Sequence, residues 1–423
     1  MIYFLLPKLP ATIYTKLNCI SSNYTVNNNE YVSLSNNLTE LPIYNTKQLQ
    51  IDYNTIHDTI QDTKLISNSL AHYLYDIKER IKECENEWDI YKKYTNPYEY
   101  IHSYVPYKKK SVAKYKPLSR SYFKMIELLE VFNLHTIDHP ISTFHLAEGP
   151  GGFIEALVYM RKTINDKYIG MTLLDDKNDD MIPAWKKSMF FLRENRNVSI
   201  ELGEDKTGNI LSLENFIYCK EKYGSSMDII TADGGFDFSI DFNNQEQNMV
   251  RLLFAQVCFA VCLQSYNGSF ILKVFDCFTE ATIDILALLS SFYKKVYITK
   301  PNTSRYANSE KYIVCKGFLF NNSNAFYPYI LKSFEEMLSI STEVKITRLL
   351  ASFNVPYYFL SKIEEYNSIF GQQQIENIHY TISLIENKQK PEKLDYLIKS
   401  NIQKCINWCI KHNLHYNTGF NDC

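Results

Sequence analysis

Four ionisable side chains lie at or beside the ends of predicted strands: Lys124, Asp233, Lys273 and Glu310. Lys124 precedes the first strand of an alternating segment, Asp233 follows the fourth, Lys273 lies on the fifth, and Glu310 precedes the last. An aspartate can hold a neighbouring lysine in one orientation, and a second ammonium nearby lowers a lysine pKa by like-charge repulsion. A neutral lysine can then act as a general base at physiological pH. Taken singly, such residues are more often structural or surface charges, so the hypothesis needs all four together.

A glycine-rich turn, Gly-Pro-Gly-Gly at 149–152, follows Glu148 at the end of the apolar run Thr143 to Ala147. A helix-compatible stretch comes next, so the pattern predicts strand, tight turn and helix. Glycines permit unusual torsions and let a ligand approach the main chain, which suggests a small-molecule site at the switch point of an α/β sheet. The turn lacks the G-x-G-x-x-G spacing, which disfavours a nicotinamide or flavin enzyme. A carboxylate before the turn suits a cationic or hydroxyl-rich ligand; a plain turn is the alternative.

The elements that must position these residues alternate between strand and helix from about Ser119 to Phe318. This pattern is typical of a largely parallel sheet with helices on both faces, an α/β fold. Residues 301–310, between the last two strands, are too few for a helical crossover, so that pair is expected to be antiparallel. Beyond the glycine-rich turn, strands are expected near 168–172, 198–202, 227–231, 269–275, 296–299 and 312–316.

The segment from Tyr91 to Pro117 interleaves lysines with tyrosines, and Lys108, Lys109 and Lys110 are consecutive within it. Lysines neutralise phosphates, and aromatic rings offer stacking faces to unpaired bases. The segment is therefore the best local candidate for an RNA-contacting surface. A solvated linker with anchoring tyrosines is the alternative, because runs of charge are usually just exposed.

The bulk composition limits the function classes. With 423 residues, the chain is long enough for two to three domains, or for one large domain with extensions. Its 45 basic and 47 acidic residues give a net charge of −2, so any RNA binding must come from local patches. The hydrophobic content of 45%, without an apolar run near the length of a membrane span, predicts a soluble globular protein with no membrane segment.

The N-terminal sequence MIYFLLPKLP has no basic leader and a proline after its apolar stretch, so it does not read as a secretory signal. Ten scattered cysteines, several in apolar runs, indicate a reducing compartment. We therefore expect a cytoplasmic protein that is not secreted.

The flanks differ from the central segment. Residues 1 to about 50 predict an irregular or loosely strand-like arm, and 53–93 have a helical pattern. Beyond Phe318 we expect roughly four helices, with breaks at Pro356 and Pro391. The expected division is an N-terminal extension at 1–117, a central domain at 118–320 and a helical C-terminal region at 321–423.

Near the C-terminus, Cys405, Cys409, His412 and His415 lie within eleven residues. Four such ligands could hold zinc, but structural zinc sites usually draw ligands from two separate elements. Cys405, Cys409 and His412 share a helix face, which is also how a core stripe looks. We therefore expect no metal.

Several motifs together resemble the RrmJ/FtsJ-type ribose 2′-O-methyltransferases. They are similar more narrowly to the cap-specific mRNA 2′-O-methyltransferases of eukaryotes and of large cytoplasmic DNA viruses. The resemblance covers about Ser119 to Phe318, and the spacing of its last motif is the most specific part. The motifs are SRSYFK at 119–124, LAEGPGGFIEAL at 146–157, ADGGF at 232–236, FILKVFD at 270–276 and KPNTSRYANSEKYIVCKG at 300–317.

The resemblance implies a Rossmann-like sheet of seven mostly parallel strands with the last antiparallel, and S-adenosylmethionine as cofactor. It places the family's catalytic Lys-Asp-Lys-Glu tetrad on Lys124, Asp233, Lys273 and Glu310. In the implied in-line displacement, Lys273 is the base that takes the ribose 2′-hydroxyl proton. Lys124 and Glu310 position the hydroxyl and tune Lys273, and Asp233 orients Lys273.

The resemblance also assigns binding residues. In the cap-specific branch, an asparagine that helps to hold the cap matches Asn243, while Arg120 and Arg305 are expected phosphate contacts. Asn209 stands where relatives often have an acidic residue near the adenine, and its side-chain carbonyl could accept a hydrogen bond from the adenine amine. The expected cofactor contacts are Glu148, Gly149, Pro150, Gly151, Gly152, Phe153, Asn209 and Asp233.

The function expected from the sequence is methylation of a ribose 2′-OH near the 5′ cap of mRNA. The partner is then the capped 5′ end, with room in the flanks for other capping or transcription proteins at a viral replication site or in a virion. Two alternatives stay open: a 2′-O-methyltransferase for internal RNA sites, and a non-catalytic RNA-binding or structural subunit of a virion or capping complex.

Overall fold

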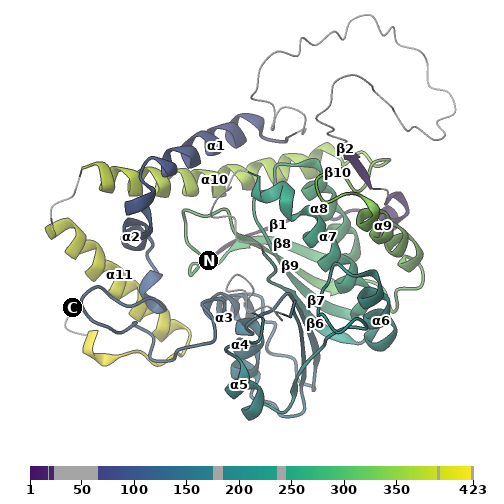
Figure 1. The fold of residues 1–423 in the computed structure, drawn as a ribbon, viewed down its shortest axis with the longest axis horizontal. Helices are drawn as coiled ribbons and strands as arrows, with labels where there is room; N and C mark the ends of the chain where they lie inside the picture. The colour runs from purple at the N-terminus through teal and green to yellow at the C-terminus, as the bar shows by residue number, and fades with distance from the viewer. Residues whose placement is uncertain (18, 23–64, 175–183, 236–243, 388–390, 421–423) are drawn as a thin grey trace, which may run out of the picture.

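The computed structural model describes residues 1–17, 19–22, 65–174, 184–235, 244–387 and 391–420. An eight-stranded mixed sheet is its framework, in the order β1-β8-β9-β7-β6-β3-β4-β5 (Figure 1). The strands are β1 (Ile2–Leu5), β3 (Ser142–Leu146), β4 (Lys167–Met171), β5 (Val198–Ile200), β6 (Met227–Ala232), β7 (Gln264–Val274), β8 (Tyr293–Lys300) and β9 (Lys311–Phe318).

Strands β3 to β7 pair in parallel, whereas β9 lies antiparallel between β7 and β8. The predicted α/β sheet and its antiparallel final pair are confirmed. The eighth strand, β1, lies in the stretch predicted to be an irregular or loosely strand-like arm, and its pairing with β8 was not predicted. Its apolar sequence IYFL pairs antiparallel with Tyr297–Lys300 and covers an edge of β8 that would otherwise have unpaired backbone groups.

Helices cover both faces of the sheet (Figure 1). Alternate strand residues face opposite sides, so Ile229 and Ile271 pack in one buried cluster while their neighbours Ile230 and Leu272 pack in the other. The first face carries α3 (Ser121–Val131), α4 (Gly152–Arg161) and α5 (Met189–Glu194), and the second carries α6 (Leu213–Tyr223), α7 (Gln245–Leu263), α8 (Glu280–Phe292) and α9 (Tyr327–Ser339).

Helix α7 is the one helix, in the described part of the chain, with the length and hydropathy of a membrane span. No apolar run of that length was expected from the sequence. In its most apolar window, 83% of the residues are buried inside the protein, and a core helix passes the same test of length and composition.

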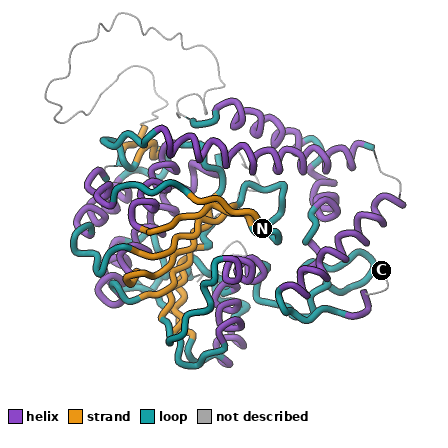
Figure 2. The backbone as a smooth tube through the Cα atoms, turned by 180° about the vertical axis from the view of Figure 1, so that it is seen from behind, coloured by secondary structure: helices purple, strands orange, loops and turns teal. Residues whose placement is uncertain are grey.

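The two flanks pack against each other and form a helical lobe, which we define as residues 65–117, 357–387 and 391–420 (Figures 1 and 2). Its core joins Ile77 and Trp88 from the N-terminal flank to Ile378 and Ile382 from the C-terminal flank. The lobe contains α1 (Asn68–Lys82), α2 (Glu85–Thr95), the 3₁₀ turn η2 (Glu99–Ile101), α10 (Tyr357–Glu386), α11 (Pro391–Lys411) and the 3₁₀ turn η3 (Thr418–Phe420).

Two expectations for the segment beyond Phe318 need correction: the number of helices and the absence of a strand. The described residues beyond Phe318 form three α-helices, α9 to α11, rather than four. The stretch Lys345–Arg348 instead forms strand β10, in which Ile346 is buried and pairs with Ser21 of β2 (Ile20–Ser22). A further 3₁₀ turn, η1 (Ala11–Lys16), buries Ile13. The expected breaks at Pro356 and Pro391 coincide with the starts of α10 and α11.

The C-terminal cysteine and histidine residues join the lobe to α3. Cys405 and Cys409 are buried in the same cluster as Trp408. His412 Nδ1 lies 2.5 Å from Glu130 Oε2 of α3, and the His415 carbonyl accepts a hydrogen bond from the Lys114 amide. The shared helix face is therefore a packing stripe.

Candidate active site

Two lysine–carboxylate pairs lie at one end of the central strands. Lys124 Nζ is 2.7 Å from Glu310 Oε2, and both side chains are 9% exposed. Lys273 Nζ donates to the Asp233 carbonyl at 2.7 Å and lies 3.4 Å from Asp233 Oδ1. The pairs also influence each other, because the charges of both lysines act on Glu310. The structure thus brings together all four residues that the sequence singled out.

The sheet register explains this meeting. Asp233 directly follows Ala232, the partner of Leu272 on the parallel strand β7, so it lies beside Lys273. Glu310 precedes Lys311, which pairs with Val274 at the same end of β7. Helix α3 carries Lys124 to this end from one face of the sheet.

Gly235 leaves room for the Lys273 side chain. A Cβ at Gly235 would lie 3.1 Å from Lys273 Nζ, which is tighter than most Cβ contacts in proteins, and 3.4 Å from its Cε. The missing side chain therefore lets the ammonium fold back onto Asp233.

Burial and charge act in opposite directions on the Lys124–Glu310 pair. Burial lowers the pKa of Lys124, and the nearby carboxylates of Glu310 and Asp233 only partly oppose this effect. Burial favours the neutral form of Glu310, but the charges of Lys124 and Lys273, together with hydrogen bonds, outweigh it and hold the Glu310 pKa below its ordinary value. Glu310 is therefore an ionised carboxylate inside the protein.

Two further residues complete the site and were missed by sequence reasoning. The Tyr312 hydroxyl donates to Asp233 Oδ1 at 2.8 Å, and Lys124 Nζ lies 5.9 Å from the centre of its ring. The Ser304 hydroxyl donates to Glu310 Oε1 at 2.6 Å. Strand periodicity could have found Tyr312, because it lies two residues after Glu310 and directly opposite Lys273.

Glu148 lies beside these pairs at the end of β3. Its Oε1 accepts hydrogen bonds from the amides of Phe153 at 2.7 Å and Ile154 at 3.2 Å, at the start of α4. Its Oε2 is buried and has no hydrogen-bond partner among the residues that the structure describes. Burial, and then the charge of Asp233, raise the Glu148 pKa well above its usual range. An acceptor in this position can receive a donor from a ligand.

The glycines of the turn allow close contacts within the protein. A Cβ at Gly149 would lie 2.5 Å from the Ala184 carbonyl, and one at Gly152 would lie 2.3 Å from the Ser119 and Ser121 hydroxyls. Gly151 has a φ of +107°, which side-chain-bearing residues rarely adopt. The protein's own chain therefore fills the space into which a Cβ at Gly149 or Gly152 would project. Pro150, between them, accepts a hydrogen bond from Ser188.

Arg120 and Arg305, the expected phosphate contacts, both meet Glu99 of η2. Arg305 donates to Glu99 from Nε at 3.0 Å and from Nη2 at 2.7 Å, and Arg120 Nη1 lies 3.7 Å from Glu99 Oε2. Their side chains are still 31% and 30% exposed, and two guanidiniums beside one carboxylate leave a positive charge in excess. Glu99 escaped the sequence analysis because nothing local marks it.

The remaining predicted binding residues have different outcomes. Asn209 Oδ1 already accepts a hydrogen bond from the Leu211 amide at 2.9 Å within its own turn. One lone pair of the oxygen that was expected to contact the adenine is therefore in use. The backbone of the preceding Gly208 packs against the Thr172 carbonyl, just beyond β4, which places this turn beside that strand end. Asn243 lies outside the described residues.

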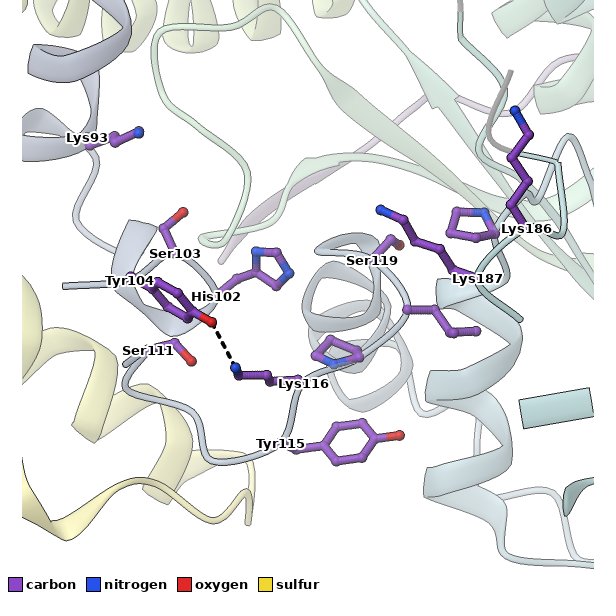
Figure 3. A pocket seen from close by; sticks show the side chains of 13 residues that line it. Lys93, His102, Ser103, Tyr104, Ser111, Tyr115, Lys116, Ser119, Lys186 and Lys187 are labelled. Carbon is purple, nitrogen blue, oxygen red and sulfur yellow. Dashed lines mark hydrogen bonds between the residues drawn. The ribbon is translucent and has the colours of Figure 1, made fainter. Parts of the chain in front are cut away.

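A pocket of about 950 Å³ opens between the helical lobe and the glycine-rich turn. Figure 3 shows Lys93, Ser103 and Tyr104 on the lobe side, facing Lys186 and Lys187 across the opening. The Lys116 ammonium donates to the Tyr104 hydroxyl at 2.9 Å. Ser119 and Pro150 also line the pocket, so it reaches the turn itself.

The pocket uses only part of the lysine- and tyrosine-rich segment. Lys93, Tyr104, Tyr115 and Lys116 line it. The consecutive residues 108–110 are exposed and do not belong to the described lining, and Lys108 Nζ lies 5.1 Å from the centre of the Phe420 ring.

A family model described as FtsJ-like methyltransferase matches residues 117–318. This part of the chain is an FtsJ-like methyltransferase domain. All four residues of the two lysine–carboxylate pairs fall within it, as do Glu148, Tyr312 and the glycine-rich turn. The matched residues exclude nearly all of the helical lobe and strand β1.

Curated relatives extend the similarity beyond the FtsJ-like domain. The chain is 26% identical over 305 residues to the cap-specific mRNA (nucleoside-2′-O-)-methyltransferase 2 of Drosophila melanogaster, covering 68% of this chain and 42% of that protein. It is 29% identical over 350 residues to the Pongo abelii protein of the same name, covering 76% and 43%. The Trypanosoma brucei brucei methyltransferase 1 is 29% identical over 254 residues, covering 58% and 65%. The chain thus spans less than half the length of the first two relatives.

Among solved structures, a protein named as a putative ribosomal RNA methyltransferase of Plasmodium falciparum aligns with a TM-score of 0.35 and 24% identity. The alignment covers 48% of this chain and 98% of that one.

S-adenosylmethionine is the methyl donor of the FtsJ-like family, and the residues present fit it. The cofactor carries an ammonium and a sulfonium, and the buried Glu148 Oε2 offers an unused acceptor beside Asp233. A cation there would compensate the charge that burial disfavours. The residues that would hold the cofactor are Glu148, the turn 149–152, Phe153 and Asp233.

Glu148→Gln is expected to change stability and cofactor binding in opposite directions. Because the folded-state pKa of Glu148 is raised, its ionisation destabilises the fold progressively as pH rises from the unfolded value through the folded one. The variant without cofactor should be more stable than wild type at pH 7, by on the order of 1 kcal/mol, with the gain vanishing toward pH 4. Loss of a charged hydrogen bond should weaken S-adenosylmethionine binding about 10- to 100-fold.

Thermal unfolding across pH, and calorimetric titration with the cofactor, measure the two effects. Glu130→Gln is a suitable control for the loss of one carboxylate, since Glu130 faces the lobe rather than the turn. Unchanged cofactor affinity in Glu148→Gln would remove Glu148 from the cofactor site.

Proposed function

We propose that this chain transfers a methyl group from S-adenosylmethionine to the 2′-oxygen of a ribose near the 5′ cap of mRNA, converting cap 0 to cap 1. The observation that carries the proposal is the meeting of the Lys273–Asp233 and Lys124–Glu310 pairs beside Glu148. A ribose hydroxyl is a poor nucleophile, and a lysine held in one orientation can remove its proton as the new bond forms.

Each residue of the proposed mechanism has a defined task. Lys273, as the neutral amine, takes the proton of the 2′-hydroxyl, and Asp233 holds its Nζ through two oxygens. Lys124 and Glu310 position the hydroxyl. Tyr312 fixes Asp233 by donating a hydrogen bond to Oδ1, the side-chain oxygen that faces Lys273. When bound, S-adenosylmethionine supplies an electrophilic methyl group, whose bond to sulfur breaks with its electron pair as the oxygen–carbon bond forms.

Glu310 is proposed to fix the charge state of its partner. Its carboxylate stays ionised because the lysine charges outweigh burial, so Lys124 keeps a fixed anionic neighbour. Lys124 then presents N–H donors to the hydroxyl oxygen while Lys273 accepts the proton. Aligned reacting groups account for much of the acceleration in such transfers.

The pocket between the lobe and the turn supports a substrate with a charged, aromatic end. Its lysines approach from both sides of the opening, and Tyr104 and Tyr115 add ring faces. Phosphates bind lysines, and unpaired bases stack on aromatic rings. The cap-specific names of the relatives agree with such a substrate.

The test is transfer of labelled methyl to two RNAs of the same sequence, one with a methylated guanosine cap and one without. We expect label only in the capped RNA, on a ribose next to the cap after nuclease digestion. Equal labelling of both RNAs, or label at internal positions, would show that the methylated ribose is an internal one and that the cap is not recognised. No transfer to any RNA by folded protein that binds the cofactor would favour a non-catalytic RNA-binding subunit.

In the same assay, the pocket variant Lys116→Ala/Lys187→Ala should raise the KM for capped RNA about tenfold with little change in kcat. Two fewer phosphate contacts should also flatten the dependence of binding on salt, by about 0.7 per contact in a log–log plot. The comparison variant is Lys108→Ala/Lys109→Ala/Lys110→Ala, outside the described lining. A larger KM effect in this triple variant would move the RNA surface from the pocket to residues 108–110.

A further inference from the structure

Glu99 is a buried carboxylate of the helical lobe that the proposed mechanism does not use. It is 1% exposed and is held by the Asn96 amide and the Ser103 hydroxyl, each at 2.7 Å. Burial opposes its ionisation, but the hydrogen bond from Arg305 and the charges of Arg120 and Arg305 outweigh burial and lower its pKa. Glu99 is therefore a fixed negative charge that the lobe inserts between two arginines of the FtsJ-like domain.

The two arginines belong to the segments that carry Lys124 and Glu310. Arg120 lies one helical turn before Lys124, and Arg305 lies in the loop that leads to Glu310. These segments are also tied directly, because Glu127 of α3 accepts the amides of Asn302 at 2.9 Å and Thr303 at 2.8 Å. A small shift of either arginine would therefore take place next to the Lys124–Glu310 pair.

Glu310 carries a charge that acts on both arginines. Arg120 and Arg305 therefore lie within electrostatic range of it. A guanidinium can bind a carboxylate through two parallel hydrogen bonds, whereas the ammonium of Lys124 is a point donor. An arginine released from Glu99 could thus displace Lys124 from Glu310.

We propose that Glu99 is a positioning residue that reserves Glu310 for Lys124 by occupying the guanidiniums of Arg120 and Arg305. This inference rests on the proposed methyl transfer, because the Lys124–Glu310 pair acts there. Arg305 is the stronger competitor. Glu99 holds Arg305 through two guanidinium hydrogen bonds, whereas Arg120 lies 3.7 Å from Glu99 and also donates to the Thr303 carbonyl at 3.2 Å.

The lobe also makes a charged contact with the segment that carries Lys273. Lys78 of α1 lies 2.9 Å from Asp276, which comes three residues after Lys273. Asp276 also lies 3.6 Å from Lys311, the residue that follows Glu310. The lobe thus makes charged contacts with segments on both sides of the active site.

The test is a kinetic comparison of Glu99→Gln with wild type on capped RNA. We expect kcat to fall about 10- to 100-fold, because the Lys124–Glu310 pair is displaced rather than removed. The affinity for S-adenosylmethionine should be unchanged. Adding Arg305→Gln should recover most of kcat, since the stronger competitor is gone, even if the KM for RNA rises. Glu386→Gln, which breaks an exposed ion pair of the lobe with Arg80, is the matched control and should leave kcat unchanged.

A wild-type kcat in Glu99→Gln, or no recovery in the double variant, would overturn the inference. If Glu99→Gln does not fold, Glu99→Asp keeps the charge but cannot reach both arginines, and we expect an intermediate kcat; a wild-type value would overturn the inference. A crystal structure of the folded variant gives a readout that does not need methyl transfer. Arg305 bound to Glu310 supports the inference even if the proposed function fails, and Glu310 still bound to Lys124 contradicts it.

Discussion

Lys273→Ala is expected to lower methyl transfer to capped RNA by about 10²- to 10⁴-fold, the usual contribution of a general base. The loss should fall on kcat, because Lys273 would act on the hydroxyl proton rather than hold the cofactor. Lys273→Arg should be nearly as inactive, since a guanidinium stays protonated and cannot accept a proton. Single-turnover transfer of labelled methyl measures the effect, and calorimetric titration with S-adenosylmethionine checks that binding survives.

Lys332→Ala is the matched control for Lys273→Ala, because it removes an exposed lysine that also pairs with a carboxylate, Glu336. It should behave as wild type. Transfer that persists within threefold of wild type in Lys273→Ala would assign the proton to another group and end the proposed mechanism.

Lys124→Met is expected to cost about 3–5 kcal/mol of unfolding free energy, because it leaves the carboxylate of Glu310 buried without its main partner. The double variant Lys124→Met/Glu310→Gln should recover most of that stability, since no uncompensated charge is left inside. Neither variant should transfer methyl groups at a measurable rate. The double variant would thus regain stability without regaining activity.

The pH dependence gives a second check on this pair. The Glu310 pKa is lowered in the folded protein, so its stabilising contribution is present above the unfolded pKa and is lost as pH falls through the folded value. In Lys124→Met the carboxylate loses its main compensating charge, so the deficit against wild type should shrink on acidification. Denaturant unfolding between about pH 4 and 8 measures the deficit. A deficit independent of pH would mean that lost packing, rather than lost charge, causes it.

The sequence could predict the meeting of Asp233 and Lys273, because consecutive strands separated by a helix tend to pair in parallel and bring their ends together. It could also predict the antiparallel last pair from the short connection through 301–310. The strand and helix pattern therefore carried most of the central fold and the placement of the four ionisable residues.

The contacts of the flanks could not be predicted in this way. Glu99 and Arg305 are 206 residues apart, and no periodicity connects them. Strand β1 has only four residues, and its partner β8 is almost three hundred positions away. The glycine-rich turn was located correctly, but its neighbours Ala184 and Ser119 became visible only once the chain was folded.

Strand β1 and the helical lobe contribute contacts that the family-matched residues 117–318 lack. A fragment trimmed to 117–318 would expose the edge of β8 and would remove Glu99 and Lys78, the charged partners of Arg120, Arg305 and Asp276. Such a fragment would retain the motifs of a methyltransferase but lose Glu99 and Lys78, the side chains that hold the segments around the active site in position. The residues matched by sequence similarity are therefore fewer than the residues that hold the active-site segments in place.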